Sequence, residues 1–228
     1  MRAMNISAFD VIGPAMVGPS SSHTAGAVRL GLLAHHIARG IAPFARVRIE
    51  LHGSFAATGK GHATDRGLVA GILGLLPDDE RLKNSLQLAR NRGIGIEFRE
   101  VDLGADAHPN SVRITFFFAD GETLVIQGAS IGGGNVQLCR IDGFETNLSG
   151  TLDSIVCWHM DRPGFLAHVT GLLACVEANI ATILTARKMR GNDAFTIIKT
   201  DSPIPDDCLS VLLRIPFVRR SVRIPKIS

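Results

Sequence analysis

The last third of the chain carries the pattern that most constrains its fold. Beyond Gly150-Thr151, apolar spacing and turn residues predict six elements in the order strand, helix, strand, strand, helix, strand. The expected ranges are 155–160, 165–176, 180–189, 194–200, 205–214 and 218–224. This βαββαβ order within about 75 residues is the ferredoxin-like plan. The sequence therefore predicts a separate C-terminal α+β domain.

The chain before Gly150 predicts a second unit of mixed strands and helices. Val47, Ile49 and Leu51 alternate with charged residues, which is typical of a half-buried strand. Strands are expected at 9–13, 46–52, 94–101, 112–119, 122–129, 136–141 and 144–148, and helices at 24–38, 65–76 and 81–91. A chain of 228 residues is long enough for two modest domains.

Composition and charge argue against several classes of partner. The net charge is only +3, and the basic pair Arg219-Arg220 is too short to indicate a nucleic-acid interface. No run reaches the roughly 18 apolar residues that a membrane helix needs, and the first residues lead into no apolar signal segment. We therefore expect a cytoplasmic protein with neither a nucleic-acid nor a membrane partner.

The cysteines argue against a metal site built by this chain alone. The four cysteines, Cys139, Cys157, Cys175 and Cys208, show no C-x-x-C spacing. A self-contained zinc or iron–sulfur site is therefore not expected. So few cysteines in a chain of this length also argue against a disulfide scaffold.

Two short loops predict a site for a small anionic molecule. They are 18–24 (GPSSSHT) and 59–65 (GKGHATD), and each precedes a helical pattern. Small residues let a ligand approach the backbone, and hydroxyls with the free N–H groups of a helix start can bind a carboxylate. Each loop also holds one histidine, His23 or His62, which can transfer a proton near neutral pH.

Each loop also has a simpler interpretation. One serine of the first loop would suffice as a helix cap, so three serines and a histidine exceed what capping requires. The stretch 53–61 resembles a phosphate-binding P-loop but has the wrong glycine spacing, and Gly61 stands where Ser or Thr is needed. Asp65 lies three residues after His62 and could orient its imidazole, or the two could be an idle surface pair.

A third glycine-rich segment, 130–134 (SIGGG), follows the predicted hairpin. Three successive glycines destabilise a strand, so we expect this backbone to do something other than pair. It could be a hinge, or it could present N–H groups to a carboxylate.

Four motifs together resemble a known family. They are the stretch 9–26, the stretch 53–65, the tripeptide His108-Pro109-Asn110 and the segment 130–134, in that order. They are similar to the β chain of the iron–sulfur-dependent L-serine dehydratases of bacteria, and the resemblance covers nearly the whole chain.

The resemblance implies an architecture. Residues 1–149 would form the serine dehydratase β domain, similar in fold to the allosteric substrate-binding domain of phosphoglycerate dehydrogenases. Residues 153–228 would form an ACT domain, in agreement with the βαββαβ order. Asp161, Pro163 and Gly164 would lie where ACT domains commonly bind an amino-acid effector. ACT domains often bind it between two copies, so a homo-oligomer through this domain is expected.

The resemblance also implies the reaction and its cofactor. L-serine would give pyruvate and ammonia, and a [4Fe–4S] cluster held by a separate α chain would act as Lewis acid on the hydroxyl group. No metal ligand is expected in this chain. His62 is the leading candidate for the base, with Asp65 as a neighbour that orients it, and His23 is the second candidate. The substrate carboxylate and ammonium would be bound by Ser20, Ser21, Ser22, Thr24, Asn110, Ser130, Gly132, Gly133 and Gly134.

Two other classes of function compete with this interpretation. A non-catalytic serine-binding regulatory module would need the carboxylate-binding residues but no poised histidine. A Ser–His hydrolase would need a nucleophile elbow, which the sequence lacks.

Overall fold

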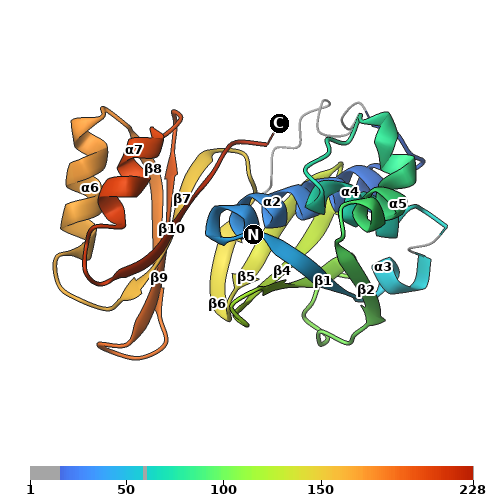
Figure 1. Cartoon of the computed structure of the whole chain (residues 1–228), viewed down its shortest axis with the longest axis horizontal. Coiled ribbons are helices and arrows are strands. Elements are labelled where there is room, and N and C mark those ends of the chain that lie inside the picture. Colours follow the sequence, from blue (N-terminus) through green and yellow to red (C-terminus); the bar gives the residue numbers. More distant parts are fainter. Residues whose placement is uncertain (1–15, 59–60, 228) are drawn as a thin grey trace.

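The chain folds into two α+β units, each built on its own sheet (Figure 1). The computed structural model describes residues 16–58 and 61–227. One sheet has six strands in the order β2-β1-β3-β4-β5-β6, and the other has four in the order β10-β7-β9-β8. The predicted fold class is confirmed. The strand expected at 9–13 lies outside the described residues.

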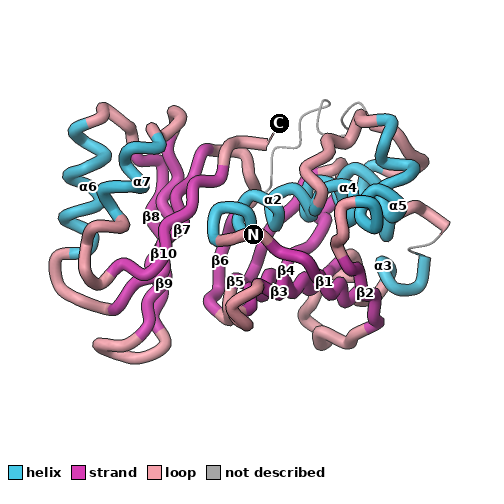
Figure 2. The backbone as a smooth tube through the Cα atoms, viewed as in Figure 1, coloured by secondary structure: helices cyan, strands magenta, loops and turns pink. Residues whose placement is uncertain are grey.

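The first unit is a six-stranded sheet with helices on one face (Figure 2). β1 and β2 run parallel, and all other neighbours are antiparallel. The strands are β1 Phe44–Leu51, β2 Gly95–Glu100, β3 Ser111–Phe118, β4 Thr123–Gly132, β5 Asn135–Ile141 and β6 Phe144–Leu148. The helical elements are η1 Ser21–Ala25, α2 Gly26–Ile41, α3 Ser54–Thr58, α4 Thr64–Ile72, η2 Glu80–Asn84 and α5 Ser85–Asn91.

Two glycines let the long helix α2 pack closely against α4. A Cβ atom on Gly71 would lie 2.0 Å from the carbonyl oxygen of Val28, and one on Gly31 would lie 2.3 Å from that of Leu68. The two helix backbones are therefore in direct contact. This contact places the start of α2 beside the start of α4, where the two histidine-containing loops end.

The second unit has the predicted βαββαβ order. Its elements are β7 Asp153–Met160, α6 Phe165–Cys175, β8 Ile180–Arg187, β9 Asp193–Thr200, α7 Asp206–Leu212 and β10 Val218–Ile224. All neighbouring strands are antiparallel. Ile155 and Cys157 point into a core with α6 and α7, whereas Val156 and Trp158 join the core of the first unit. The alternation along β7 thus buries both faces of this sheet, which stands between the helix pair and the first unit (Figure 1).

The glycine-rich segment 130–134 differs from its prediction. Ser130 pairs with Val136 and Gly132 pairs with Asn135, so the segment ends β4 and turns into β5. Gly133 and Gly134 have φ values of 58° and 80°, which suit the two central residues of a tight hairpin turn. The expectation that this backbone does not pair was therefore wrong, because the glycines supply the turn between two paired strands.

Helix ends differ from their predicted positions for local reasons. The predicted helix 65–76 ends at Ile72, since Gly74 adopts φ of 82° and the N–H of Leu75 returns to the carbonyl of Ala70. The predicted helix 81–91 begins as a 3₁₀ turn in η2 and continues as α5. The helix predicted at 24–38 begins three residues earlier, with the π-helical turn η1. No helix within the described ranges is long and apolar enough to cross a membrane.

A partly buried hydrogen bond joins the two units. Asp142, in the turn between β5 and β6, accepts hydrogen bonds from the Val125 backbone N–H and the Trp158 indole N–H, both at 2.9 Å. Burial raises the pKa of the Asp142 carboxyl, although the two N–H donors oppose that shift. Phe144 of β6 stacks on Phe195 of β9 beside this bond.

We expect Asp142→Asn to destabilise the chain by about 1–3 kcal/mol, because one buried N–H would then face an amide NH₂ instead of an acceptor. Asparagine tolerates the positive φ of 49° at this position, so the change tests the hydrogen bond and not the turn. Urea unfolding of the Asp142→Asn and Trp158→Phe variants and of their double variant measures the effect. Strictly additive free energies would contradict a direct interaction between the two residues.

Candidate functional site

The two histidine-containing loops meet at the N-terminal end of α2. His23 Nε2 is hydrogen-bonded to Ser54 Oγ at 3.1 Å, and its ring lies edge-on to Phe55. The buried hydroxyl of Thr24 donates to the backbone carbonyl of His62 at 3.0 Å. The centroids of the His23 and His62 rings are 5.2 Å apart. Two imidazole rings from segments almost forty residues apart in the sequence thus lie next to each other.

The other two motifs complete this arrangement. The carbonyl of Pro109 accepts the backbone N–H of Ser54 at 2.8 Å, and a Cβ atom on Gly53 would collide with the same carbonyl. The carbonyl of Asn110 accepts the N–H of Ser130 at 3.0 Å. The Ser130 side chain in turn lies against Gly26, where an added Cβ would be 2.1 Å from Ser130 Oγ. All four motifs therefore form one closed ring of contacts, which is the candidate site.

The surroundings of His23 favour the neutral form of its imidazole. Burial lowers the pKa of His23, and the nearby His62 ring lowers it further. Its neutral form therefore persists below the usual value of 6.5. The folded chain binds a proton on His23 less tightly than the unfolded chain does. The neutral His23 therefore contributes to the free energy of unfolding above pH 6.5, and this contribution is lost as the pH falls through the lowered pKa.

We expect His62→Gln to raise the pKa of His23, because a neutral amide removes the repulsion between two imidazolium rings while burial remains. Titration of the His23 ring by NMR in the full chain measures this. The matched control is His36→Gln on α2, where the changed histidine contacts His35 and not His23. An unchanged His23 pKa in His62→Gln would show that the two rings are not electrostatically coupled.

Asp65 and His62 are not brought together as a pair. Asp65 accepts the N–H of Arg66 at 2.8 Å, and it lines a separate cleft of about 380 Å³ near Phe98. Within the described residues no hydrogen bond or ion pair joins it to His62. His62 is exposed, and its N–H bonds back to the carbonyl of Thr58. In this structure the neighbour that faces the His62 ring is His23.

The serine loop divides its hydroxyls between capping and the site. Ser20 caps the helical turn by accepting the N–H of His23 at 3.1 Å. Ser21 and Ser22 are half-buried, and in the described part of the chain their hydroxyls make no protein hydrogen bond. Ser130 Oγ and Thr64 Oγ1 are buried and have no partner there either. Buried hydroxyls are normally satisfied, so their lack of a partner supports a polar ligand at this site.

Two residues of the site were not singled out from the sequence. Ser54 lies in a quoted motif, but only the fold shows that its hydroxyl bonds to His23. Arg29 donates from Nη1 to the carbonyl of Gly134 at 3.0 Å. The sequence feature that could have singled out Arg29 is its position in the predicted helix. It lies three residues after Gly26 and is the basic residue in an otherwise apolar stretch.

The expected effector residues lie in the second unit, away from this ring. Asp161 accepts the N–H of Gly191 at 3.0 Å and an N–H of Arg187 at 2.8 Å, and these contacts lower the pKa of its carboxyl. Gly164 has φ of 93° and precedes α6, and Pro163 is exposed beside it. The Asp161 carboxylate is thus engaged in joining the turn to β8.

The cysteines do not form a ligand set. Cys157 and Cys208 are buried in the second unit, Cys175 is exposed at the end of α6, and Cys139 lies on β5. Across residues 16–58 and 61–227, no group of three or more His, Cys, Asp or Glu side chains could hold a metal ion. The described residues therefore lack the clustered thiolates that hold a [4Fe–4S] cluster.

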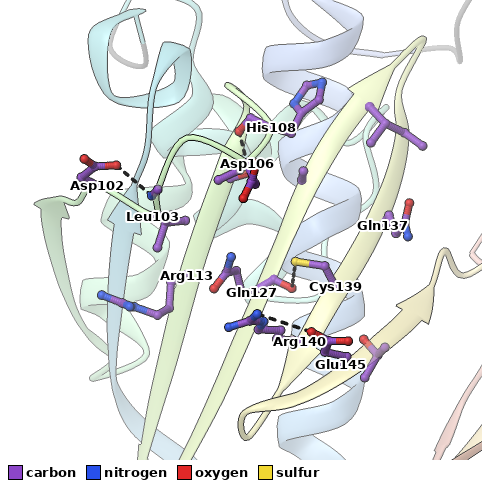
Figure 3. Close-up of a pocket in the computed structure, with 16 residues that line it drawn as sticks. Asp102, Leu103, Asp106, His108, Arg113, Gln127, Gln137, Cys139, Arg140 and Glu145 are labelled. Atoms are coloured by element: carbon purple, nitrogen blue, oxygen red, sulfur yellow. Dashed lines mark hydrogen bonds and ion pairs between the residues drawn. The ribbon is translucent and has the colours of Figure 1, made fainter.

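A wide cavity in the described structure lies on the face of the sheet opposite to α2 (Figure 3). It has a volume of about 670 Å³ and is floored by β3, β4 and β5, with Gln127, Gln137 and Cys139 among its lining residues. Successive residues of β4 point to opposite faces, so Ile131 lines this cavity while Ser130 faces α2. The cavity therefore opens on the face of the sheet opposite to Ser130 and α2, although His108 of the third motif and Ile131 of the fourth also line it.

Comparisons with known proteins show the family of this chain. A family model described as "Serine dehydratase beta chain" matches residues 7–92, which include the first two motifs. The chain is 41% identical over 207 residues to the L-serine dehydratase β chain of Peptoniphilus asaccharolyticus, covering 91% of this chain and 92% of that one. It is also 41% identical over 218 residues to a probable L-serine dehydratase β chain of Bacillus subtilis, covering 96% and 97%.

The relationship extends to a second group of enzymes. The chain is 27% identical over 156 residues to a D-3-phosphoglycerate dehydrogenase of Synechocystis, covering 67% of this chain and 28% of that one. This agrees with the expected similarity to part of that enzyme. With 41% identity over nearly the full length of both chains, the chain belongs to the family of L-serine dehydratase β chains.

Proposed function

We propose that this chain is the β subunit of an L-serine ammonia-lyase, which converts L-serine to pyruvate and ammonia together with a separate α chain. Residues 1–149 would be the serine dehydratase β domain and residues 153–228 the ACT domain. The observation that carries the proposal is the ring of four motifs, which places two imidazoles and several unsatisfied hydroxyls together.

The proposed chemistry begins with loss of the Cα proton of serine. His62 would accept this proton, because its ring is exposed at the rim of the site and can reach a substrate bound partly by another chain. His23 is the second candidate, and its contact with Ser54 would set its orientation. As the Cα–H electron pair forms the new Cα–Cβ double bond, the Cβ–O bond would break. The leaving hydroxyl would take up one proton, equal in number to the proton lost from Cα, and depart as water. The resulting aminoacrylate tautomerises and hydrolyses to pyruvate and ammonia.

The remaining polar groups would bind the charged ends of the substrate. We assign the carboxylate and ammonium to the hydroxyls of the serine loop with Thr24, to Asn110, and to Ser130 with the glycine turn. Backbone N–H groups at the start of a helix and in a left-handed turn are suited to a carboxylate. The assignment of Asp65 as the orienting neighbour of His62 has no hydrogen bond to support it here.

The proposed α chain would hold the [4Fe–4S] cluster. The cysteines of this chain lie on separate elements, which supports placing the cluster on a partner. We also propose that the enzyme is cytoplasmic and that the ACT domain binds an amino acid near Asp161, Pro163 and Gly164. Homo-oligomerisation would use the edge strand β8, whose Ile183 and Leu184 are exposed.

The test is anaerobic co-expression with the candidate α chain, followed by a pyruvate assay on L-serine. Each chain alone serves as the control. Pyruvate from the pair only, together with bound iron and sulfide, is the expected result. A pair that assembles with an intact cluster and makes no pyruvate would instead favour a serine-binding regulatory module. Calorimetry of L-serine with this chain would then test that alternative.

A further inference from the structure

We propose that Arg29 is a positioning residue of the candidate site, which holds the Gly133-Gly134 turn in place for the carboxylate of the substrate. The inference rests on the proposed function and deepens it. It concerns the affinity of the site for an α-amino acid carboxylate, and not the proton transfer.

The position of Arg29 on α2 directs its side chain to the hairpin. Helical side chains lean toward the N-terminus, so the guanidinium reaches back along α2 toward the level of Gly26. There Nη1 donates to the carbonyl of Gly134 at 3.0 Å. Among the described residues, Arg29 supplies the side-chain hydrogen bond that ties the turn 132–134 to α2.

The turn benefits from such a hydrogen bond because its three glycines leave the backbone conformationally free. Gly132, Gly133 and Gly134 all have positive φ, with values of 108°, 58° and 80°. Glycine loses more conformational freedom on folding than any other residue. An added Cβ on Gly132 would meet no atom within 4 Å, so that side of the turn faces open space. The bond from Arg29 therefore adds a link from the turn to α2, beyond the strand pairing of Gly132 with Asn135.

Within residues 16–58 and 61–227, the charge of Arg29 also has no carboxylate partner. Its Nε atom is buried and has no hydrogen-bond partner, and no carboxylate of the described residues forms an ion pair with its guanidinium. Burial lowers the pKa of this arginine. A partly buried cation without a counter-ion is costly, and a guanidinium matches a carboxylate with two parallel hydrogen bonds. The turn and its arginine thus form a positive edge beside the buried hydroxyl of Ser130.

The kinetic test compares Arg29→Met with Arg92→Met in the α–β complex. Arg92 makes the same kind of bond, from Nη1 to the carbonyl of Leu73 at 2.9 Å, but at the end of α4. We expect Arg29→Met to raise KM for L-serine by about 10- to 100-fold, the loss of one charge-assisted hydrogen bond, with kcat changed far less. Added guanidinium should restore part of the affinity. An unchanged KM, or an equal rise in Arg92→Met, would overturn the proposal.

A second test does not depend on activity. Amide hydrogen exchange of the full chain without the α chain should be about tenfold faster from Gly132 to Val136 in Arg29→Met, and unchanged there in Arg92→Met. If the wild-type pair makes no pyruvate, the proposed reaction fails while exchange still measures the hold of Arg29 on the turn. Exchange equal to wild type would show that Arg29 does not hold it.

Discussion

The change His62→Gln is expected to lower kcat/KM of the α–β complex for L-serine by about 10²- to 10⁴-fold, the usual contribution of a positioned general base. Glutamine keeps a polar side chain of similar length but accepts no proton near neutral pH. The Thr24 hydroxyl bonds to the backbone carbonyl of His62, so the loop should keep its conformation in the variant. A steady-state pyruvate assay of the assembled complex measures the effect.

Two comparisons make this result interpretable. His36→Gln removes a histidine from α2, the helix that follows the η1 turn of His23, without touching the site, and we expect activity close to wild type. His23→Gln should reduce activity less than His62→Gln if His62 is the base. Retained activity in His62→Gln would rule out that role and transfer it to His23, whereas a loss alone would not prove it.

Gly71→Ala is expected to destabilise the chain by about 3 kcal/mol, the upper end of overpacking penalties. The added Cβ would lie 2.0 Å from the carbonyl of Val28 and 2.6 Å from the N atom of Leu32. Both contacts are to backbone, so a side-chain rotation cannot relieve them, and α2 would have to move away from α4. Urea unfolding of the full chain measures this loss.

Gly171→Ala provides the matched control. Gly171 also lies within a helix, α6, but an added Cβ would meet no atom within 4 Å. Alanine is the better helix former, so this change should stabilise the chain by about 0.5–1 kcal/mol. Opposite signs for the same substitution would show that helix contact, and not helix propensity, decides the effect at Gly71. Equal signs would contradict the close packing of α2 on α4.

Local pattern was a reliable guide to the elements of this chain. The βαββαβ order of the second unit follows from apolar periodicity and from turns such as 161–164, and the structure reproduces it. The hairpin about Asp120-Gly121 likewise follows from turn chemistry between two alternating strands. Errors include helix ends, as at Gly74, where one residue in a left-handed conformation decides how far a helix continues. They also include the short helix α3, for which no helix is expected from the sequence pattern.

The partners of each site residue were not predictable in the same way. The spacing of His62 and Asp65 favoured a pair, yet the structure brings His62 to His23 and turns Asp65 toward another cleft. Sequence spacing indicates which side chains can share one face of a helix or strand. It does not indicate which other helix, strand or loop packs against that face.

The fold class, most of the elements and the four motifs can be derived from the sequence, because periodicity, capping and turn formation depend on residues close together in the chain. The ring of motifs, the contact of Ser54 with His23 and the reach of Arg29 to Gly134 become visible in the folded chain alone. Those contacts depend on how closely α2 packs on α4 and on β4. That distance is set by glycines whose missing side chains carry no periodic signal.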